Sequence, residues 1–151
     1  RHGFDHFYFL NGHGGNIATI NAAFSEIYAQ RSLDEAANNR PSLRFKLRNW
    51  WSAPSAQSLS RELYGGSEGS HATPSEVSLS YFAHPEAVKS VTLNPRLAPN
   101  GPIRDANDYR QNFPDGRIGS DPSLANVDDG ERIYKATVAD LALDYRGFLD
   151  G

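Results

Sequence analysis

The chain has 151 residues, of which 38% are hydrophobic and 22% charged, which suits one globular domain with a core of its own. Its net charge of −3 gives no general attraction to nucleic acid or to an anionic membrane, so we expect neither as a partner. Cysteine is absent, so a metal site must be built from His, Asp and Glu. No apolar segment reaches the roughly 18 residues of a membrane span and no signal peptide is visible. We therefore expect a cytoplasmic protein.

The chain begins with the pattern of a strand, a glycine-rich turn and a helix. Residues 3–10 (GFDHFYFL) are almost continuously apolar, which is typical of a strand buried on both faces of a sheet. The turn 11–16 (NGHGGN) follows, and apolar residues at helical spacing predict an amphipathic helix over 16–31 with Asn16 as its N-cap. This order is the opening of an α/β unit.

The middle of the chain continues the pattern of strands and helices. Residues 43–51 (LRFKLRNWW) alternate apolar with basic side chains and predict a second strand. Helices are predicted over 54–64 and 74–83, each with a proline near its first turn.

A long irregular segment precedes the last predicted helix. Residues 89–127 are rich in Pro, Gly, Asn and Asp, with at most one strand at 90–94 (SVTLN), and such segments tend to be binding loops or contact surfaces. The last helix is predicted over 128–149. Its expected apolar stripe comprises Tyr134, Val138, Leu141, Tyr145 and Phe148.

Five histidines are the first candidates for chemistry. His2 lies at the start of the chain, and His6 lies inside the first strand, where a buried and hydrogen-bonded histidine is the expected arrangement. His84 precedes a proline at a helix end and is expected at the surface or as a capping residue. His13 and His71 are left as candidates for a functional role.

His13 directly follows the carboxyl end of a predicted strand, the edge where open α/β sheets bind ligands. Gly14 and Gly15 permit positive φ and close approach of backbone N–H groups, and the N-terminus of the following helix favours a negative oxygen. A βα turn with an incidental histidine explains the same residues, because a glycine-rich turn by itself is not specific.

His71 lies in a loop before a helix whose first turn contains Glu76. As a functional pair, the imidazole would act as a general acid or base and the carboxylate would bind a metal. The alternative is that Glu76 is a structural first-turn acid, which the helix dipole stabilises without any ligand.

Three motifs together resemble the creatininase, or creatinine amidohydrolase, family. They are NGHGGN at 11–16, HATPSEVS at 71–78 and FPDGRIGSDPSLAN at 113–126, before a long terminal helix. The resemblance covers essentially the whole chain and corresponds to the C-terminal majority of a family member. It implies a three-layer α/β/α fold with a mostly parallel sheet, a single domain over 1–151 that is incomplete at its N-terminus, and a homo-oligomer.

The resemblance also implies a function and a set of site residues. Members hydrolyse linear or cyclic amide C–N bonds of small molecules with one or two divalent metal ions, commonly Zn, Mn or Fe. His13 matches the metal-binding histidine, Glu76 matches the metal-binding glutamate of an HAGxxET motif, and His71 matches the histidine that shuttles the proton. The residues expected to bind the substrate are Asn11, Gly14, Gly15 and Asn16.

The chain departs from the family pattern in several places. The first metal motif, E-x-H-G-x-H-L-P followed by an Asp, is expected upstream of Arg1, so a companion N-terminal segment would supply further ligands. In creatininase itself a Tyr-Glu pair, whose Glu binds metal, replaces the glycine pair of the turn. Ser67 stands where creatininase has a substrate-facing Trp, and Thr73-Pro74 replaces the usual Gly. Because Ser67 replaces this Trp, the resemblance does not extend to creatinine as the substrate.

We therefore expect a metal-activated water to attack the amide carbon while His71 protonates the leaving nitrogen. The alternative is a non-catalytic fragment or subunit that keeps the fold and an interface but lacks the upstream ligands. A third interpretation, an anion-binding module at the His13 turn, is weaker because no Lys or Arg lies within the turn. Fold and metal site are shared by enzymes with different pockets, so the substrate is left open.

Overall fold

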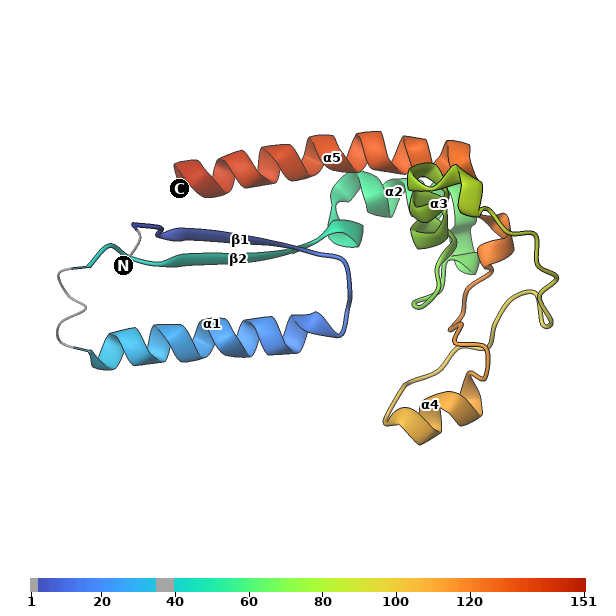
Figure 1. Ribbon diagram of the computed structural model, residues 1–151, viewed down its shortest axis with the longest axis horizontal. Coiled ribbons are helices and arrows are strands. Elements are labelled where there is room, and N and C mark those ends of the chain that lie inside the picture. The colour runs from blue at the N-terminus through green and yellow to red at the C-terminus, as the bar shows by residue number, and fades with distance from the viewer. Residues whose placement is uncertain (1–2, 35–39) are drawn as a thin grey trace. The chain divides into compact units, whose positions relative to one another are not determined.

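The structure is a computed structural model that describes residues 3–34 and 40–151, so the prediction for His2 lies outside the described residues. The described part is a mixed α/β structure with five α-helices and a two-stranded parallel sheet (Figure 1). Contacts divide the chain into unit 1, Arg1–Ala53 with Asp140–Gly151, and unit 2, Pro54–Ala139. The single domain expected over the whole chain stays a prediction. No α-helix within the described ranges is both long and apolar enough to cross a membrane.

Unit 1 contains the sheet. Strand β1 (His6–Asn11) pairs in parallel with β2 (Arg44–Asn49), and helix α1 (Asn16–Leu33) connects them. Parallel neighbours require such a crossover, so the predicted α/β unit is confirmed. Within this pairing, Asn11 and Asn49 lie opposite each other at the carboxyl ends of both strands.

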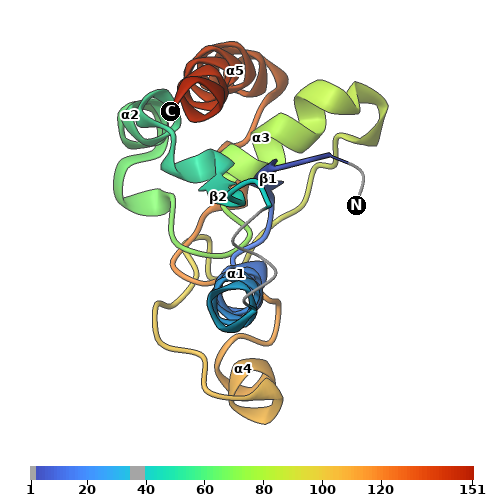
Figure 2. The same ribbon diagram turned by 90° about the vertical axis from the view of Figure 1, so that its left-hand side faces the viewer.

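The two faces of the sheet pack against different helices. On one face Phe24 of α1 stacks on Phe45, with ring centroids 4.9 Å apart. On the other face Tyr8 meets Tyr145 at 5.3 Å, in the C-terminal part of α5 (Val127–Asp150). Figures 1 and 2 both show the strands between α1 and this part of α5. Side chains alternate along a strand, which explains why neighbouring aromatic residues serve opposite faces.

Strand β1 is less buried than predicted. Asn11 is its one buried residue, whereas Phe9 and Leu10 are 40% and 60% exposed. The expectation of a strand that is buried along its length is therefore wrong for the described residues, although each face of the sheet contacts a helix. The physical reason is that each strand has one neighbour in the sheet, so one edge of each is left uncovered.

Unit 2 is built from helices and long loops. Helices α2 (Pro54–Tyr64) and α3 (Pro74–Ala83) have the predicted bounds, and a third helix, α4 (Ala106–Asn112), lies in the irregular segment. The N-terminal part of α5 completes the unit, and α5 extends one residue further at each end than the predicted 128–149.

Helices α3 and α5 touch at Ser78 and Gly130. A Cβ atom on Gly130 would lie 2.0 Å from the carbonyl oxygen of Ser78, so this crossing requires a glycine. The Ser78 hydroxyl hydrogen-bonds the Tyr64 hydroxyl at 2.9 Å and accepts from the backbone N–H of Asn126 at 3.1 Å. Burial raises the pKa of Tyr64 to about 12, so the phenol stays neutral.

The apolar stripe predicted for the last helix is corrected in the N-terminal part of α5. The buried line of α5 is Gly130, Ile133 and Thr137, whereas Tyr134 and Val138 of the predicted stripe are 50% and 45% exposed. The tight crossing at Gly130, which hydrophobicity alone does not reveal, sets which side of the helix is buried.

The irregular segment contains a helix, α4, that was not predicted. Residues 90–94 form no strand, which agrees with the expectation of at most one strand there. A helix of seven residues is too short to show an apolar periodicity in the sequence, which explains why it was not predicted. Its first turn is stabilised by the Asp105 side chain, which accepts from the backbone N–H groups of Asn107 and Asp108.

Candidate functional site

The turn before α1 is held by the side chain of Asn11, which is 4% exposed. Its Nδ2 donates to the backbone oxygen of His13 and to Oδ1 of Asn49, both at 2.8 Å. Its Oδ1 accepts from the backbone N–H of His13 at 3.2 Å and from Nδ2 of Asn16 at 3.1 Å. Asn11 thereby ties the ends of both strands to the start of α1. The substrate-binding roles expected for Asn11 and Asn16 stay predictions.

Two details of this turn differ from expectation. Gly15, not Asn16, occupies the N-cap position, and it has no side chain that could cap the helix. The Asn16 side chain instead donates to Oδ1 of Asn11. Gly14 and Gly15 do not have positive φ; Gly15 is right-handed helical at φ −62°. Gly15 instead leaves space for the imidazole, since a Cβ atom at this position would lie 2.7 Å from Nε2 of His13.

The His13 side chain is exposed, and its ring nitrogens make no hydrogen bond within the described part of the chain. The imidazole lies over Gly15 with both nitrogens available to a ligand.

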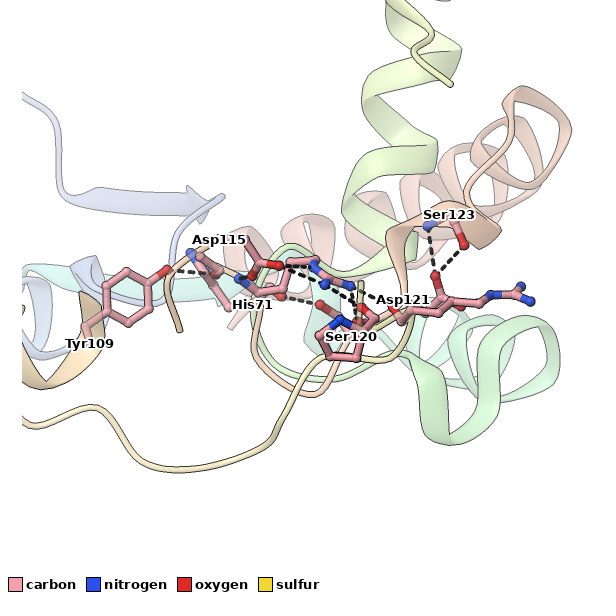
Figure 3. Close-up of polar contacts among 10 residues, drawn as sticks. His71, Tyr109, Asp115, Ser120, Asp121 and Ser123 are labelled. Atoms are coloured by element: carbon pink, nitrogen blue, oxygen red, sulfur yellow. Dashed lines mark hydrogen bonds and ion pairs between the residues drawn. The ribbon is translucent and has the colours of Figure 1, made fainter. Parts of the chain in front are cut away.

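The loop of His71 is fixed through its backbone by residues from a distant part of unit 2. The His71 carbonyl accepts from the hydroxyl of Ser120 at 2.7 Å and from the backbone N–H of Ile118 at 3.3 Å. The backbone N–H of Ser70 donates to the Ile118 carbonyl at 2.9 Å. Ser120 and Ile118 are buried, whereas the His71 imidazole is exposed and meets the ring of Tyr109 edge-on at 6.0 Å (Figure 3).

Gly69 makes this close approach of the two backbones feasible. Its φ of +68° is left-handed, and a Cβ atom would lie 2.4 Å from the carbonyl oxygen of Ile118 and 2.6 Å from the nitrogen of Ser120. Any other residue would push the His71 loop away from 118–120.

Residues 118–120, which hold the His71 backbone, are themselves held in place by Arg117, which is 4% exposed. Its guanidinium donates to the carbonyls of Pro95 and Arg96, both at 2.7 Å, and to the Asp115 carboxylate at 2.7 Å (Figure 3). The hydrogen bond from Arg117 lowers the pKa of Asp115 despite an opposing contribution from burial. An arginine has five N–H donors, and here they join the loop at 95–96 to the loop at 115–120.

Asp121 belongs to the same loops, because its carboxylate pairs with Arg96, whose carbonyl accepts from Arg117. Burial favours its neutral form, but hydrogen bonds from the Ser123 hydroxyl and from Nε of Arg96, the latter at 2.7 Å, outweigh burial and lower the pKa of Asp121 (Figure 3). The carboxylate thus stays ionised and caps the short turn that follows it.

Glu76 takes part in a capping box at the start of α3. Its Oε2 accepts from the backbone N–H and from the hydroxyl of Thr73, both at 3.2 Å, while its own N–H donates to the Thr73 hydroxyl at 3.2 Å. The structural interpretation of Glu76 is therefore confirmed. Its other oxygen, Oε1, accepts no hydrogen bond from the described residues, and the metal-binding role stays a prediction.

Glu68 is a candidate that the sequence reasoning missed. It accepts a hydrogen bond from the Ser75 hydroxyl, while its second oxygen, Oε2, is buried and has no partner within the described ranges. Burial raises the pKa of Glu68. A glutamate in a Gly- and Ser-rich loop, three residues before His71, is the signal that was available in the sequence.

Of the other histidines, the structure describes His6 and His84, and neither is arranged for catalysis. His6 is half-buried, with Nδ1 2.7 Å from the Asp5 carboxylate, but its buried Nε2 has no partner among the described residues, so the expected hydrogen bonding is met at one nitrogen. His84 is exposed at the C-cap of α3, 3.3 Å from Glu86, as predicted for a surface or capping residue.

The predicted site residues fall into two sets. His71 and Glu76 belong to one loop and helix of unit 2, whereas His13 belongs to unit 1 with the substrate-binding candidates. Within residues 3–34 and 40–151 no three His, Asp or Glu side chains gather into a group that could hold a metal. Imidazole and carboxylate fit Zn, Mn or Fe by donor type, but two such ligands are fewer than the three protein ligands of a typical catalytic zinc.

Comparison with known proteins identifies the family. A comparison with curated proteins returned no match. The creatininase family model, described as creatinine amidohydrolase, matches residues 1–143, a range that contains all three sequence motifs. The family consists of hydrolases known for metal-dependent hydrolysis, which implies an amidohydrolase kind of function. On this match over nearly its whole length, the chain belongs to the creatininase family.

Proposed function

We propose that the protein is a metal-dependent amidohydrolase that cleaves an amide C–N bond of a small molecule. The observation that carries the proposal is the family match over residues 1–143. The three-layer α/β/α fold with a larger, mostly parallel sheet is part of the proposal, and the helix on each face of the β1–β2 pair supports it. A cytoplasmic homo-oligomer completes the proposal.

His13 and Glu76 are the proposed ligands of a divalent ion, Zn, Mn or Fe. The free ring nitrogens of His13 and the free Oε1 of Glu76 support this assignment. Since two side chains are too few, the proposal takes the remaining ligands from a companion segment. When bound, the metal would supply Lewis acidity toward a water molecule and the amide carbonyl.

His71 is the proposed proton donor to the leaving nitrogen. Its carbonyl is held by Ser120 and Ile118 while its imidazole is exposed, so the ring can meet a substrate without the backbone moving. The next residue, Ala72, has φ +53°, a conformation that costs energy for a residue with a Cβ atom. This sharp change of direction separates the imidazole from the capping box that begins at Thr73.

The turn of His13 is the proposed site for the negative oxygen that develops on the substrate. Gly14 and Gly15 come immediately before α1, where N–H groups and the helix dipole favour negative charge. Removal of one such donor costs about 3 kcal/mol of transition-state stabilisation in other hydrolases. Asn11 and Asn16 complete the proposed substrate-binding set.

The test compares His13→Ala, Glu76→Gln and His71→Ala in the full-length protein, with the exposed His84→Ala as the matched control. We expect His13→Ala and Glu76→Gln to lose bound Zn, Mn or Fe, measured by elemental analysis. His71→Ala should keep the metal and lose hydrolysis of a panel of linear and cyclic amides that includes creatinine. Unchanged metal content in His13→Ala together with an unchanged rate in His71→Ala would overturn the proposal.

A non-catalytic subunit is the second candidate, and the lack of a three-ligand group within the described part of the chain favours it. Native mass spectrometry of the chain with added Zn(II), alone and with a companion segment, distinguishes the two. Metal uptake that appears with the companion supports the enzyme, whereas a chain that takes up no metal in either case supports the subunit.

A further inference from the structure

The imidazole of His71 is exposed, and a side chain of α4 lies against it. The ring centroid of Tyr109 is 6.0 Å from that of the imidazole, with 73° between the two planes (Figure 3). Aromatic rings prefer such an edge-on arrangement at separations of about 4.5–7 Å. A histidine side chain at the surface can turn about two single bonds, so a neighbouring ring limits the orientations that the imidazole adopts.

Tyr109 is itself firmly held. Its hydroxyl donates to the carbonyl of Gly116 at 2.7 Å, and its ring meets that of Phe113, which is 3% exposed, at 5.9 Å. Its backbone N–H donates to the carbonyl of Asp105 at 2.9 Å, at the start of α4. The ring is thus held at its hydroxyl, by a neighbouring ring and through its backbone, so it is a rigid support for a side chain that leans on it.

One loop segment holds both Tyr109 and His71. Gly116 accepts from the Tyr109 hydroxyl, and its left-handed φ of +82° and the 3.2 Å that would separate a Cβ atom from this hydroxyl both favour glycine. Ile118 and Ser120, which follow in the chain, donate to the His71 carbonyl at 3.3 and 2.7 Å. The position of the phenol ring relative to the imidazole is therefore determined by the same segment.

We propose that Tyr109 is a positioning residue for His71. Its ring, anchored by the hydrogen bond to Gly116, confines the imidazole to a narrow range of orientations. The functional consequence rests on the proposed role of His71 as proton donor, because proton transfer to a leaving nitrogen requires a ring nitrogen at hydrogen-bonding distance and in alignment. Helix α4, which the irregular segment contains, then serves to bring an aromatic ring to this imidazole.

The first test measures the mobility of the His71 ring by NMR relaxation in the metal-free, full-length protein. In the wild type we expect an ordered imidazole with nuclear Overhauser contacts to the Tyr109 ring. Tyr109→Leu removes the supporting ring, so the imidazole should become as mobile as that of a solvated histidine. Tyr109→Phe keeps the ring but loses the hydrogen bond to Gly116, and an intermediate mobility is expected. An imidazole as ordered in Tyr109→Leu as in the wild type would overturn the proposal.

Tyr81 provides the matched control. Its hydroxyl also donates to a backbone carbonyl within unit 2, that of Lys89 at 3.3 Å, but its ring belongs to α3 and not to the contact with His71. Tyr81→Leu and Tyr81→Phe should both leave the His71 ring ordered. If Tyr109→Leu does not fold, Tyr109→Phe decides, because an imidazole with full wild-type order after loss of the hydroxyl contradicts the anchored ring.

The second test asks whether Tyr109 acts through His71. The substrate is the linear or cyclic amide that the wild-type, full-length protein hydrolyses fastest. Tyr109→Leu should lower kcat about tenfold, with KM changed by less than about threefold and the Zn content unchanged, because orientation and not binding is lost. Tyr109→Phe should recover most of kcat. In the His71→Ala background, Tyr109→Leu should cause no further loss, and a further tenfold loss there would contradict the proposal.

The two measurements separate this inference from the proposed function. If Tyr109→Leu frees the imidazole but His71→Ala keeps the full rate, Tyr109 positions the ring and only the proton-donor role of His71 fails. If His71→Ala loses hydrolysis while Tyr109→Leu keeps both the ordered ring and the wild-type kcat, the proposed function stands and the positioning role of Tyr109 is wrong.

Discussion

The turn of His13 and the loop of His71 each place an exposed histidine before a helix, but different parts of the chain hold them. His13 depends on Asn11, two residues away, which also reaches Asn49 on the neighbouring strand. His71 depends on Ser120, 49 residues later, which is itself fixed within the loop cluster of Arg117. Local contacts therefore determine the first histidine, whereas a network of distant loops determines the second.

The glycines of the two segments show the same contrast. A Cβ atom on Gly14 would meet nothing within 4 Å, whereas one on Gly69 would lie within 2.6 Å of three backbone atoms. The motif that looks richest in glycine is thus the more tolerant of the two.

The largest effect is expected for Gly69→Ala. The new methyl group would overlap the backbone of 118–120, and the left-handed φ adds strain, so we expect a loss of at least about 2–3 kcal/mol in the free energy of unfolding. Chemical denaturation measures it. Gly14→Ala is the matched control and should change stability by less than about 0.5 kcal/mol. Equal losses in both variants would contradict the contrast.

Asn11→Ala is expected to have the next largest effect. The substitution removes hydrogen bonds to His13, Asn16 and Asn49 and leaves buried polar groups unpaired, at a cost of about 2 kcal/mol in the free energy of unfolding. NMR should also show a mobile His13 ring and an unchanged His71 ring. A disturbance of His71 in this variant would show that the two segments are not supported separately.

The sequence predicted those features that depend on residues close together in the chain. The bounds of α2 and α3 follow from Pro54, Pro74 and the glycines after Tyr64, and the family motifs marked His13 and His71. Glu68, Gly69 and Arg117 were not assigned roles, since those roles arise from contacts between segments distant in the chain. Periodicity likewise missed the buried side of the N-terminal part of α5, where a backbone contact at Gly130 determines it. Further along the helix the predicted stripe did include Tyr145 and Phe148, whose rings contact Tyr8.

The two units should respond to acid with opposite signs. In unit 1, burial acts to raise the pKa of Asp144, but hydrogen bonds from Lys46 and Tyr8 outweigh it and lower that pKa. Its contribution to stability is therefore present above the ordinary pKa of about 4 and lost as the pH falls further. Asp144→Asn should cost about 1 kcal/mol at neutral pH and progressively less under acid, measured by unfolding at each pH. A pH-independent loss would contradict this account.

In unit 2, the raised pKa of Glu68 has the reverse consequence. Below the unfolded pKa of about 4.3 the group contributes nothing, and as the pH rises through the folded pKa its ionisation destabilises the fold. Glu68→Gln should therefore raise the free energy of unfolding by about 0.5–1 kcal/mol at neutral pH, a gain that disappears in acid. The exposed Glu86→Gln provides the baseline, and a loss of stability in Glu68→Gln at neutral pH would show that the ionised form is the one that the fold favours.

The smallest change in stability is expected for Gly15→Ala, which nevertheless tests the His13 turn most directly. Gly15 already has right-handed backbone angles, so alanine is accommodated without strain. Its methyl group would lie 2.7 Å from Nε2 of His13, and the imidazole, as the far end of a side chain, can rotate away. We expect an unchanged free energy of unfolding and a shift of the NMR signals of the His13 ring. In the protein with its companion segment, Zn(II) should bind several-fold more weakly. Gly14→Ala should leave both unchanged, because the space beside Gly14 is open. Weakened stability without a change at the His13 ring would mean that the second glycine serves the helix start and not the imidazole.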